Sequence, residues 1–292
     1  MSDLGATRAA ASRRSRLRRA QRECARIARQ EATNFYWGFI ALPHEKRTAI
    51  YALYSFARQV DDEADSGLGG AEAGIQRQRE RLRSCLRGTR DDAVTVILGE
   101  AVDRYGIQAS ELEEVIDGVA MDLTPPRFAD WDELQAYCRR VAGAVGRMCV
   151  RIFGDSSPEG LDRANRLGLA LQLTNILRDV REDAGMGRCY LPEGDLRQFG
   201  MSVEDVLALR CGDGWEGFVA HQVDRARGLY ADGLHVCDHI PHSSAACVRT
   251  MAGIYRGILE EIAGNPRRVL EERISLPPSR KLSVAVGAWL HA

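Results

Sequence analysis

The stretch from Gln172 to Pro192 constrains the fold of this chain most strongly, because its polar and apolar residues recur at helical spacing. Four side chains with amide or carboxylate oxygens stand at i, i+3, i+7 and i+11, so they line one face of a helix: Gln172, Asn175, Asp179 and Asp183. An apolar stripe on another face can bury against neighbouring helices: Leu169, Leu173, Ile176 and Val180. Ionised carboxylates four residues apart repel each other unless a cation compensates. Because Arg178 and Arg188 flank this row, the pattern favours a site for a divalent cation and phosphate over a solvated surface.

A second stretch, residues 51–65, repeats this arrangement at helical spacing. Asp61 and Asp65 stand one turn apart on the same face, whereas Asp62 points elsewhere and is the weaker candidate. Two helices that each carry an Asp-x-x-x-Asp pair suit Mg²⁺, which prefers oxygen ligands and leaves positions for water and substrate phosphate. We therefore expect the two rows to face each other, so that metal ions bridge a diphosphate between them.

The rest of the chain shows helical periodicity interrupted by turn residues, without an alternating strand, a solenoid repeat or a linker between domains. Three segments have the spacing of helix capping boxes: Ser110-x-x-Glu113, Asp130-x-x-Glu133 and Ser202-x-x-Asp205. The sequence therefore predicts an all-α chain with one helical domain over residues 22–292. Residues 1–21 are rich in Ala, Ser and Arg, and we expect a disordered basic tail there. A membrane-surface anchor and an organellar transit peptide are the alternatives for this tail.

The composition excludes several classes of function. A formal net charge of −1 gives the whole chain no polyanion-binding balance, so no nucleic-acid partner is expected. Eight cysteines without CxxC or Cys/His ligand spacing indicate reduced thiols rather than a zinc site. The sequence contains no run of about 18 apolar residues, so no segment is expected to span a membrane. We expect a cytoplasmic protein that becomes peripheral at a membrane surface where a lipid substrate draws it there.

Both acidic stretches, together with the segment Tyr137 to Gly146 (YCRRVAGAVG) between them, resemble the squalene/phytoene synthase family of head-to-head prenyl transferases. The similarity runs from about Asn34 to about Leu282. It implies a single-domain helical bundle of the class I isoprenoid synthase type around a central cavity. It also implies a Mg²⁺-dependent reaction, with Mn²⁺ as a substitute, that joins two allylic prenyl diphosphates through a cyclopropyl intermediate. The implied metal ligands are Asp61, Asp65, Asn175, Asp179 and Asp183.

The resemblance implies further roles around the metal. Planar guanidinium groups match phosphate oxygens: Arg58, Arg178 and Arg188. Tyrosines near the diphosphate end of the cavity ease the charge of a carbocation: Tyr54, Tyr137 and Tyr255. Gln172 orients the substrate or an intermediate. Small residues after Tyr137 line a prenyl chain, although tight helix packing also explains them: Val141, Ala144 and Val145. A Ser-rich stretch of many relatives is replaced here, which leaves Thr33 and Asn34 as donors to phosphate.

Three segments look like bacterial squalene-type synthases of hopanoid pathways: RISLPPSRKL (273–282), VGRMCVRIFG (145–154) and FARQVDD (56–62). On this resemblance we expect two farnesyl diphosphates to be joined to presqualene diphosphate, and converted to squalene where a reductant is accepted. The alternative is a phytoene synthase that joins two geranylgeranyl diphosphates. A non-catalytic assembly protein is the third hypothesis, and the intact acidic rows argue against it. No Gly-rich dinucleotide-binding motif is present, and neither presqualene diphosphate nor phytoene requires NADPH.

Overall fold

The structure, a computed structural model, is helical throughout the part of the chain that it describes. It describes residues 2–64 and 70–290, with side chains from residue 11 onward, and these ranges contain no β-strand. The all-α prediction is therefore confirmed. Within the same ranges, no helix is long and apolar enough to cross a lipid bilayer. The predicted metal ligand Asp65 lies outside the described residues.

The N-terminal half of the chain packs around the helix that carries the first acidic stretch. Its elements are α1 (Ser2–Glu31), α2 (Tyr36–Phe39), α3 (His44–Ala64), α4 (Ala71–Leu86), α5 (Ala93–Tyr105), α6 (Ala109–Ala120) and the 3₁₀ turn η1 (Met121–Leu123). α3 buries an apolar face that includes Leu53, Phe56 and Val60. This face packs against α1, α4, α5 and α6, which leaves the polar face of α3 for the acidic residues.

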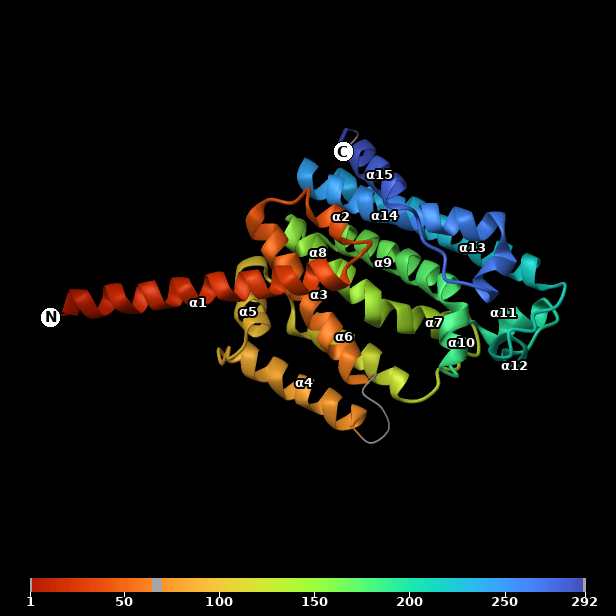
Figure 1. Ribbon diagram of the computed structural model, residues 1–292, viewed down its shortest axis with the longest axis horizontal. Helices are drawn as coiled ribbons and strands as arrows, with labels where there is room; N and C mark the ends of the chain where they lie inside the picture. Colours follow the sequence, from red (N-terminus) through yellow and green to blue (C-terminus); the bar gives the residue numbers. More distant parts are fainter. Residues whose placement is uncertain (1, 65–69, 291–292) are drawn as a thin grey trace.

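The C-terminal half packs around the long helix that carries the start of the second acidic stretch, near the middle of the molecule in Figure 1. Its elements are α7 (Trp131–Cys138), the π-helical turn η2 (Arg139–Gly143), α8 (Ala144–Phe153), α9 (Pro158–Arg178), α10 (Val180–Gly185), α11 (Glu193–Gln198), α12 (Val203–Leu207), α13 (Trp215–Gly233), η3 (Leu234–Asp238), α14 (His242–Gly264), η4 (Pro266–Leu270) and α15 (Pro278–Leu290). α9 packs against α8, α13 and α14. The hydroxyls of Thr174 on α9 and Tyr230 on α13 share a buried hydrogen bond of 3.0 Å. At Gly168, α9 comes so close to η2 that a Cβ would lie 2.6 Å from the carbonyl oxygen of Ala142. α9 is therefore held rigidly, and with it the start of the second acidic stretch.

Buried charges connect α8 to α6. The guanidinium of Arg147 lies 3.7 Å from Glu111 and 2.6 Å from Glu114, and that of Arg151 lies 3.1 Å from Glu111. Glu111 is only 5% exposed, so its charge depends on these two arginines. Because an unpaired buried charge is strongly destabilising, the network fixes how α8 lies on α6.

Two of the three predicted helix starts are confirmed. The Asp130 side chain caps α7, and the Ser202 side chain caps α12 within a capping box. The prediction for Ser110 is wrong. The Glu111 side chain instead accepts a hydrogen bond of 3.2 Å from the backbone N–H of Gln108, so the helix begins before Ser110.

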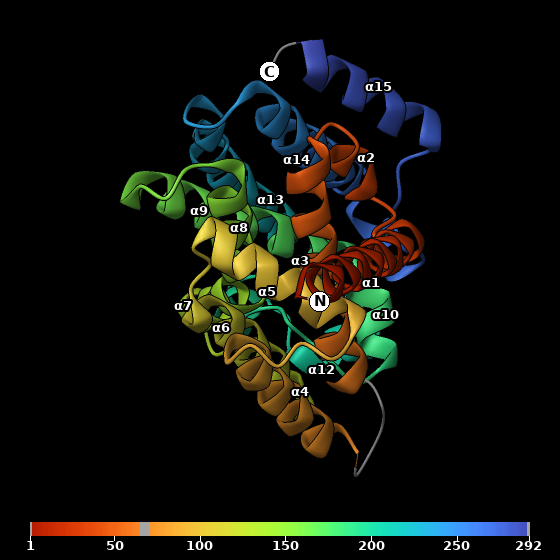
Figure 2. The same ribbon diagram turned by 90° about the vertical axis from the view of Figure 1, so that its left-hand side faces the viewer.

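The N-terminal segment differs from the expected disordered tail. Residues 2–31 form one helix, α1, which extends away from the body in Figure 1 and points toward the viewer in Figure 2. The prediction for residues 1–21 is thus corrected over residues 2–21, where the many Ala and Arg residues are strong helix formers. α1 joins the core only in its second half, where Ala20, Cys24 and Ala28 are buried.

Candidate active site

The first acidic stretch lies along the polar face of α3. Asp61 is exposed, and Arg58 lies one turn before it. Nη2 of Arg58 is 2.9 Å from Oδ1 of Asp62, and its Nε is 3.9 Å from Oε2 of Glu31. This Nε is buried without a hydrogen-bond partner, so it can still donate to an anion. Asp62, the weaker candidate for a metal ligand, is therefore the partner of the arginine.

Three aromatic rings from separate segments form a wall beside this stretch. Phe35, in the turn after α1, stacks on Tyr255 of α14 with ring centroids 5.2 Å apart. The same ring meets Tyr54 of α3 edge-on at 6.5 Å. Burial raises the pKa of Tyr54 to about 12, although the charge of Arg58 opposes the shift, so Tyr54 stays a neutral phenol. The sequence pattern did not select Phe35, whose ring joins the site only through the fold.

The second acidic stretch is not the single continuous helix that its spacing predicted. α9 ends at Arg178, and Asp179 leaves the helical conformation with φ −100° and ψ 10° before α10 begins at Val180. The backbone N–H of Asp179 still donates to the carbonyl of Asn175 at 2.9 Å, and that of Asp183 donates to the carbonyl of Asp179 at 2.9 Å. The backbone therefore bends at Asp179, but hydrogen bonds with helical spacing continue through the bend. Aspartate favours such positions because it is a weak helix former.

Two guanidinium groups hold the carboxylate of Asp179. Nε and Nη2 of Arg178 donate to it at 2.7 and 2.5 Å, and Nε of Arg273 donates at 3.0 Å. Arg178 is only 6% exposed, and its guanidinium lies 5.9 Å from the ring centroid of Tyr255. Arg273 precedes α15 and was not among the predicted site residues, because nothing near it in the sequence indicates this contact.

These contacts connect the two acidic stretches. Arg178 lies over Tyr255, and Tyr255 stacks on Phe35. Phe35 meets Tyr54, whose pKa responds to the charge of Arg58 on the same helix. The fold thus brings predicted residues of α3, α9 and α14 to one aromatic wall. Binding of one diphosphate by both stretches stays a prediction.

The amides of the second stretch show one feature that fits a metal ion. Nδ2 of Asn175 donates to Oε1 of Gln172 at 3.4 Å. Oδ1 of Asn175 is buried and has no hydrogen-bond partner, which is unfavourable by about 1–3 kcal/mol unless a cation or donor approaches it. Within the described ranges, no three Asp, Glu, His or Cys side chains come close enough to hold a metal by themselves. The donors that fit Mg²⁺ here are therefore mixed, an amide oxygen with carboxylates.

Asp183 is a carboxylate whose surroundings disfavour its ionised form. Burial and the charge of Asp179 raise the pKa of Asp183 to about 7, while Arg188 opposes the shift. The backbone N–H of Arg188 also donates to the carbonyl of Asp183 at 2.8 Å, which places the arginine next to the row. The ionised form of a half-buried carboxylate in this environment is stabilised when a divalent cation binds.

Tyr137, a predicted site residue, belongs to a cluster whose other members the sequence pattern did not select. The hydroxyls of Tyr137 and Tyr190 donate to the two carboxylate oxygens of Asp122 at 3.0 and 2.9 Å. The two tyrosines are buried, and their ring centroids are 5.4 Å apart. The ring of Phe128 covers both. The charge of Asp122 contributes to the raised pKa of Asp183, so the cluster belongs to the same region. Tyr190 lies inside the motif from Gln172 to Pro192, which was a signal for it, whereas Asp122 had none.

The remaining predicted residues lie in two places. In the small-residue segment, Ala144 is fully buried, Val145 is half-buried, and Val141 packs so closely on Gly118 that a Cβ there would lie 2.6 Å from its Cγ1. Tight helix packing therefore accounts for this segment, and contact with a prenyl chain stays a prediction. In the turn between α1 and α2, Thr33 is exposed and Asn34 half-buried.

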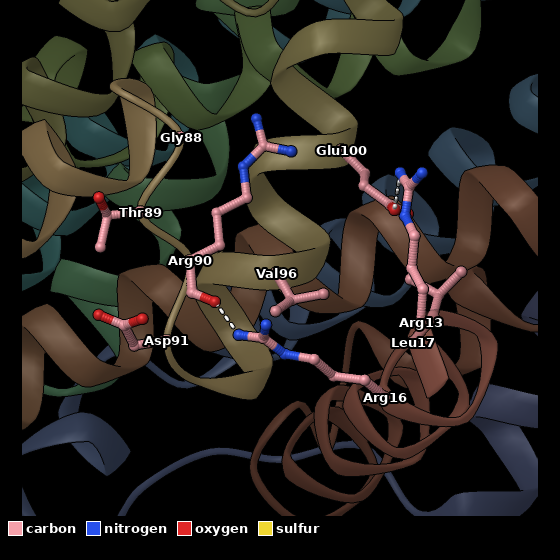
Figure 3. Close-up of a pocket in the computed structure, with 9 residues that line it drawn as sticks. All are labelled: Arg13, Arg16, Leu17, Gly88, Thr89, Arg90, Asp91, Val96 and Glu100. Atoms are coloured by element: carbon pink, nitrogen blue, oxygen red, sulfur yellow. Dashed lines mark hydrogen bonds and ion pairs between the residues drawn. The ribbon is translucent and has the colours of Figure 1, made fainter. Parts of the chain in front are cut away.

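A cavity of about 330 Å³ lies elsewhere, between α1 and the start of α5 (Figure 3). Arg13 and Arg16 of α1 point into it, the first toward Glu100 and the second onto the carbonyl oxygen of Arg90. None of its lining residues is a predicted site residue, so we assign this cavity to the attachment of α1 to the body.

Comparison with known proteins gives one consistent group of relatives. A family model described as squalene/phytoene synthase matches residues 28–280. The phytoene synthase of Mycobacterium tuberculosis is 41% identical over 267 residues, which cover 90% of this chain and 88% of that protein. A crystal structure of a dehydrosqualene synthase in complex with a ligand has a TM-score of 0.86 and 25% identity over 94% of this chain and 97% of the other. The squalene synthase HpnC from Alicyclobacillus acidocaldarius has a TM-score of 0.80 and 28% identity over 88% and 97%.

Proposed function

The chain belongs to the squalene/phytoene synthase family and is a prenyltransferase, and from this premise we propose that it joins two geranylgeranyl diphosphates head to head to phytoene. The observation that carries the proposal is the 41% identity to a phytoene synthase over 90% of this chain. The expectation of farnesyl diphosphate and presqualene diphosphate rested on three short segments, and similarity over the whole chain outweighs them. A thirty-carbon product from farnesyl diphosphate is the second candidate, supported by the similarity to a squalene synthase and a dehydrosqualene synthase.

We propose Mg²⁺ as the cofactor. Asp179, Asp183 and Asn175 would hold it from the second acidic stretch, and Asp61 and Asp65 from the first. The unpartnered Oδ1 of Asn175 and the raised pKa of Asp183 support this assignment, because both are relieved by a cation. When bound, Mg²⁺ supplies a Lewis acid that neutralises the departing diphosphate. Neither NADPH nor another reductant is required for phytoene.

The side chains of this protein bind the diphosphate and protect the carbocation. Arg58 offers its Nε, which makes no hydrogen bond within the protein, and Arg188 lies beside Asp183. Arg273 is half-exposed and held by carboxylates alone, so it can turn to a phosphate oxygen. The aromatic wall of Phe35, Tyr54 and Tyr255 stabilises an allylic cation through its π-faces and keeps water away from it.

A competition experiment tests the product. Farnesyl and geranylgeranyl diphosphate are offered in equal amounts with Mg²⁺ and no reductant, and products are identified by mass spectrometry. We expect forty-carbon phytoene to dominate and to disappear when Mg²⁺ is chelated. A thirty-carbon product without phytoene would support the second candidate. No coupled product from either substrate would support the non-catalytic hypothesis.

We further propose that the protein associates transiently with an anionic membrane surface, since its substrates and product are lipids. The outer face of α15 exposes an apolar stripe: Leu282, Val286, Trp289 and Leu290. The outer face of α1 exposes arginines: Arg14, Arg18, Arg19 and Arg22. α15, α2 and α1 follow one side of the molecule in Figure 2. Apolar residues beside cations are typical of peripheral binding to anionic lipid.

Sedimentation with vesicles tests this association. Wild type should bind vesicles that contain phosphatidylglycerol more tightly than pure phosphatidylcholine vesicles, and V286E on α15 should weaken both. Wild type and V286E are also compared by size-exclusion chromatography. A wild-type dimer that V286E abolishes, with vesicle binding unchanged, would show that a second copy of the chain covers α15 instead.

A further inference from the structure

The cavity at the attachment of α1 continues into a second cavity along the same helix. The second has a volume of about 250 Å³ and lies between α1, the start of α3, and α5. Leu17 of α1 and Glu100 of α5 line both cavities, so the two adjoin and form one groove, the α1 groove. Among the described residues that line it, none belongs to the two acidic stretches or to the aromatic wall. The α1 groove is therefore separate from the candidate active site.

One end of the groove is basic. Arg16 donates to the carbonyl oxygen of Arg90, a neutral partner, and no carboxylate with a described side chain pairs with it. A guanidinium has five N–H donors, so Arg16 has others for an anion. Arg13 lies 4.0 Å from Glu100 and its side chain is 84% exposed, so this ion pair is weak. Asp91 also lines the cavity, but Figure 3 shows its carboxylate pointing away from both arginines of α1.

The loop before α5 holds this basic end in place. Nη2 of Arg90 lies 2.5 Å from Oδ2 of Asp103. Its side chain lies so close to Gly99 that a Cβ there would be 2.1 Å from Nε. Gly88 in the same loop has a φ of +97°, which favours glycine. The carbonyl oxygen that accepts from Arg16 is therefore fixed, and the arginine is oriented before any ligand binds.

The other end of the groove has an apolar floor. Ala49 of α3 and Ile97 and Ala101 of α5 lie at its base, and each is only 3–4% exposed. Leu17 and Tyr105 are half-buried at its sides. More exposed polar side chains complete the lining: Gln21, His44, Glu45, Thr48 and Arg104. An apolar chain on this floor loses its contact with water, which is favourable.

A basic end followed by an apolar floor suits an amphiphile with a phosphate headgroup. Guanidinium groups match phosphate oxygens in charge and geometry. Free phosphate leaves the apolar floor in contact with water, and a purely apolar ligand leaves the charge of Arg16 uncompensated. The first cavity alone, at about 330 Å³, falls within the range of about 300–1,000 Å³ that is usual for small-ligand sites.

We propose that the α1 groove binds one phospholipid molecule of an anionic membrane. Its phosphate binds at Arg13 and Arg16, and part of one acyl chain lies on Ala49, Ile97 and Ala101. The lipid fastens α1 to the body and orients its protruding half on the membrane surface, on the side that α15 also follows in Figure 2. The inference rests on the proposed membrane association for the source of the lipid, and it adds a single bound lipid with a defined place.

A monomeric lipid tests the groove without a membrane. The full-length protein is titrated, without Mg²⁺, with dihexanoyl phosphatidylglycerol below its critical micelle concentration, and backbone hydrogen–deuterium exchange is measured. We expect protection of residues 13–21 and 86–92. Dihexanoyl phosphatidylcholine should bind about fivefold more weakly, because its choline cation repels the arginines. Inorganic phosphate should bind about tenfold more weakly, because it has no chain to bury.

Three variants locate the bound lipid. Arg16→Gln should weaken binding of phosphatidylglycerol about tenfold, because it removes a charged donor to the phosphate. Leu17→Gln should weaken it about threefold and leave binding of inorganic phosphate unchanged. Arg18→Gln is the matched control, since it removes the same charge from the same helix outside the groove and should change binding by less than about twofold.

The alternatives give different results. Equal weakening by Arg16→Gln and Arg18→Gln would overturn the groove in favour of a general attraction to α1. Inorganic phosphate that binds as tightly as the lipid would overturn it in favour of a site for a free anion. Tighter binding of geranylgeranyl diphosphate, with the same protected residues, would overturn it in favour of a second prenyl diphosphate site. Absence of protection up to the critical micelle concentration would overturn it outright.

Failure of the proposed membrane association is distinguishable from failure of this inference. The first would abolish sedimentation with vesicles while the monomeric lipid still protects residues 13–21 and 86–92. V286E on α15 makes the same separation, because Val286 lies outside the groove and the variant should bind the monomeric lipid as wild type does. Failure of the proposed coupling appears only in the product analysis, since lipid binding is measured without turnover.

Discussion

On α3, Asp61 is exposed and its neighbour Arg58 is bound to Asp62, whereas at the junction of α9 and α10 Asp179 is bound by two guanidinium groups. Asp183, one turn later, is half-buried, and its pKa is raised to about 7. Aspartates from two stretches with the same Asp-x-x-x-Asp spacing thus lie in different environments. The second stretch is built into the protein by ion pairs and partial burial, whereas Asp61 of the first stretch is left exposed. The two should therefore differ in what a substitution does to stability, even where both abolish activity.

The largest effect is expected for Asp179→Asn. Turnover should fall by about 1000-fold, because a group that acts as the diphosphate leaves is lost. The free energy of unfolding should also fall by about 2 kcal/mol, since buried Arg178 loses its charged partner. Spacing alone suggested the opposite, that removing a carboxylate relieves repulsion. Urea unfolding at equal ionic strength decides between the two, and an unchanged or raised midpoint would contradict the comparison.

Asp61→Asn should affect activity without affecting stability. We expect turnover to fall by about 100-fold, with the free energy of unfolding within about 0.5 kcal/mol of wild type because Asp61 is exposed. Asp62→Asn is the matched control, since it removes the adjacent carboxylate that pairs with Arg58. Equal losses of turnover in both variants would mean that the charge of the segment matters and not the position of Asp61.

A smaller effect is expected where the two stretches meet, at the aromatic wall. Tyr255→Leu should lower the free energy of unfolding by about 2 kcal/mol, because it removes the ring beneath Arg178 and the stacking partner of Phe35. Tyr105→Leu is the control, because the half-buried Tyr105 ring lies beside the exposed Arg104 and outside the wall, and this change should cost less than Tyr255→Leu. Thermal unfolding of both variants checks this, and similar losses would show that the wall adds no stability of its own.

The smallest effect is expected for Arg273→Gln. The KM for the prenyl diphosphate should rise about fivefold at unchanged kcat, if the half-exposed arginine binds substrate and transition state equally. Stability should stay within about 0.5 kcal/mol, as for other exposed ion pairs. Arg280→Gln is the control, because its partner Glu261 lies outside both acidic stretches. A fall in kcat without a change in KM would place Arg273 in the chemical step instead.

Periodicity in the sequence determined the features that depend on neighbours along the chain. Helical spacing correctly indicated the helices that carry both acidic stretches, and polar residues before apolar segments indicated the caps at Asp130 and Ser202. Spacing did not predict the bend at Asp179, because one guanidinium that binds its carboxylate arrives from the distant Arg273. It also did not decide the length of the prenyl chain, since three short segments pointed to one product and similarity over the whole chain to the other.

Only the tertiary structure decided which distant residues complete the site. Phe35, Asp122 and Arg273 have no local pattern that marks them, yet each contacts a residue that the sequence did mark. The sequence by itself determined the helices, the family and the two rows of oxygens, because these follow from spacing within one helical turn or one motif. Contacts between segments depend on how helices pack. At Gly168 and Gly118 the packing is so close that a Cβ on either glycine would lie 2.6 Å from an atom of the neighbouring segment.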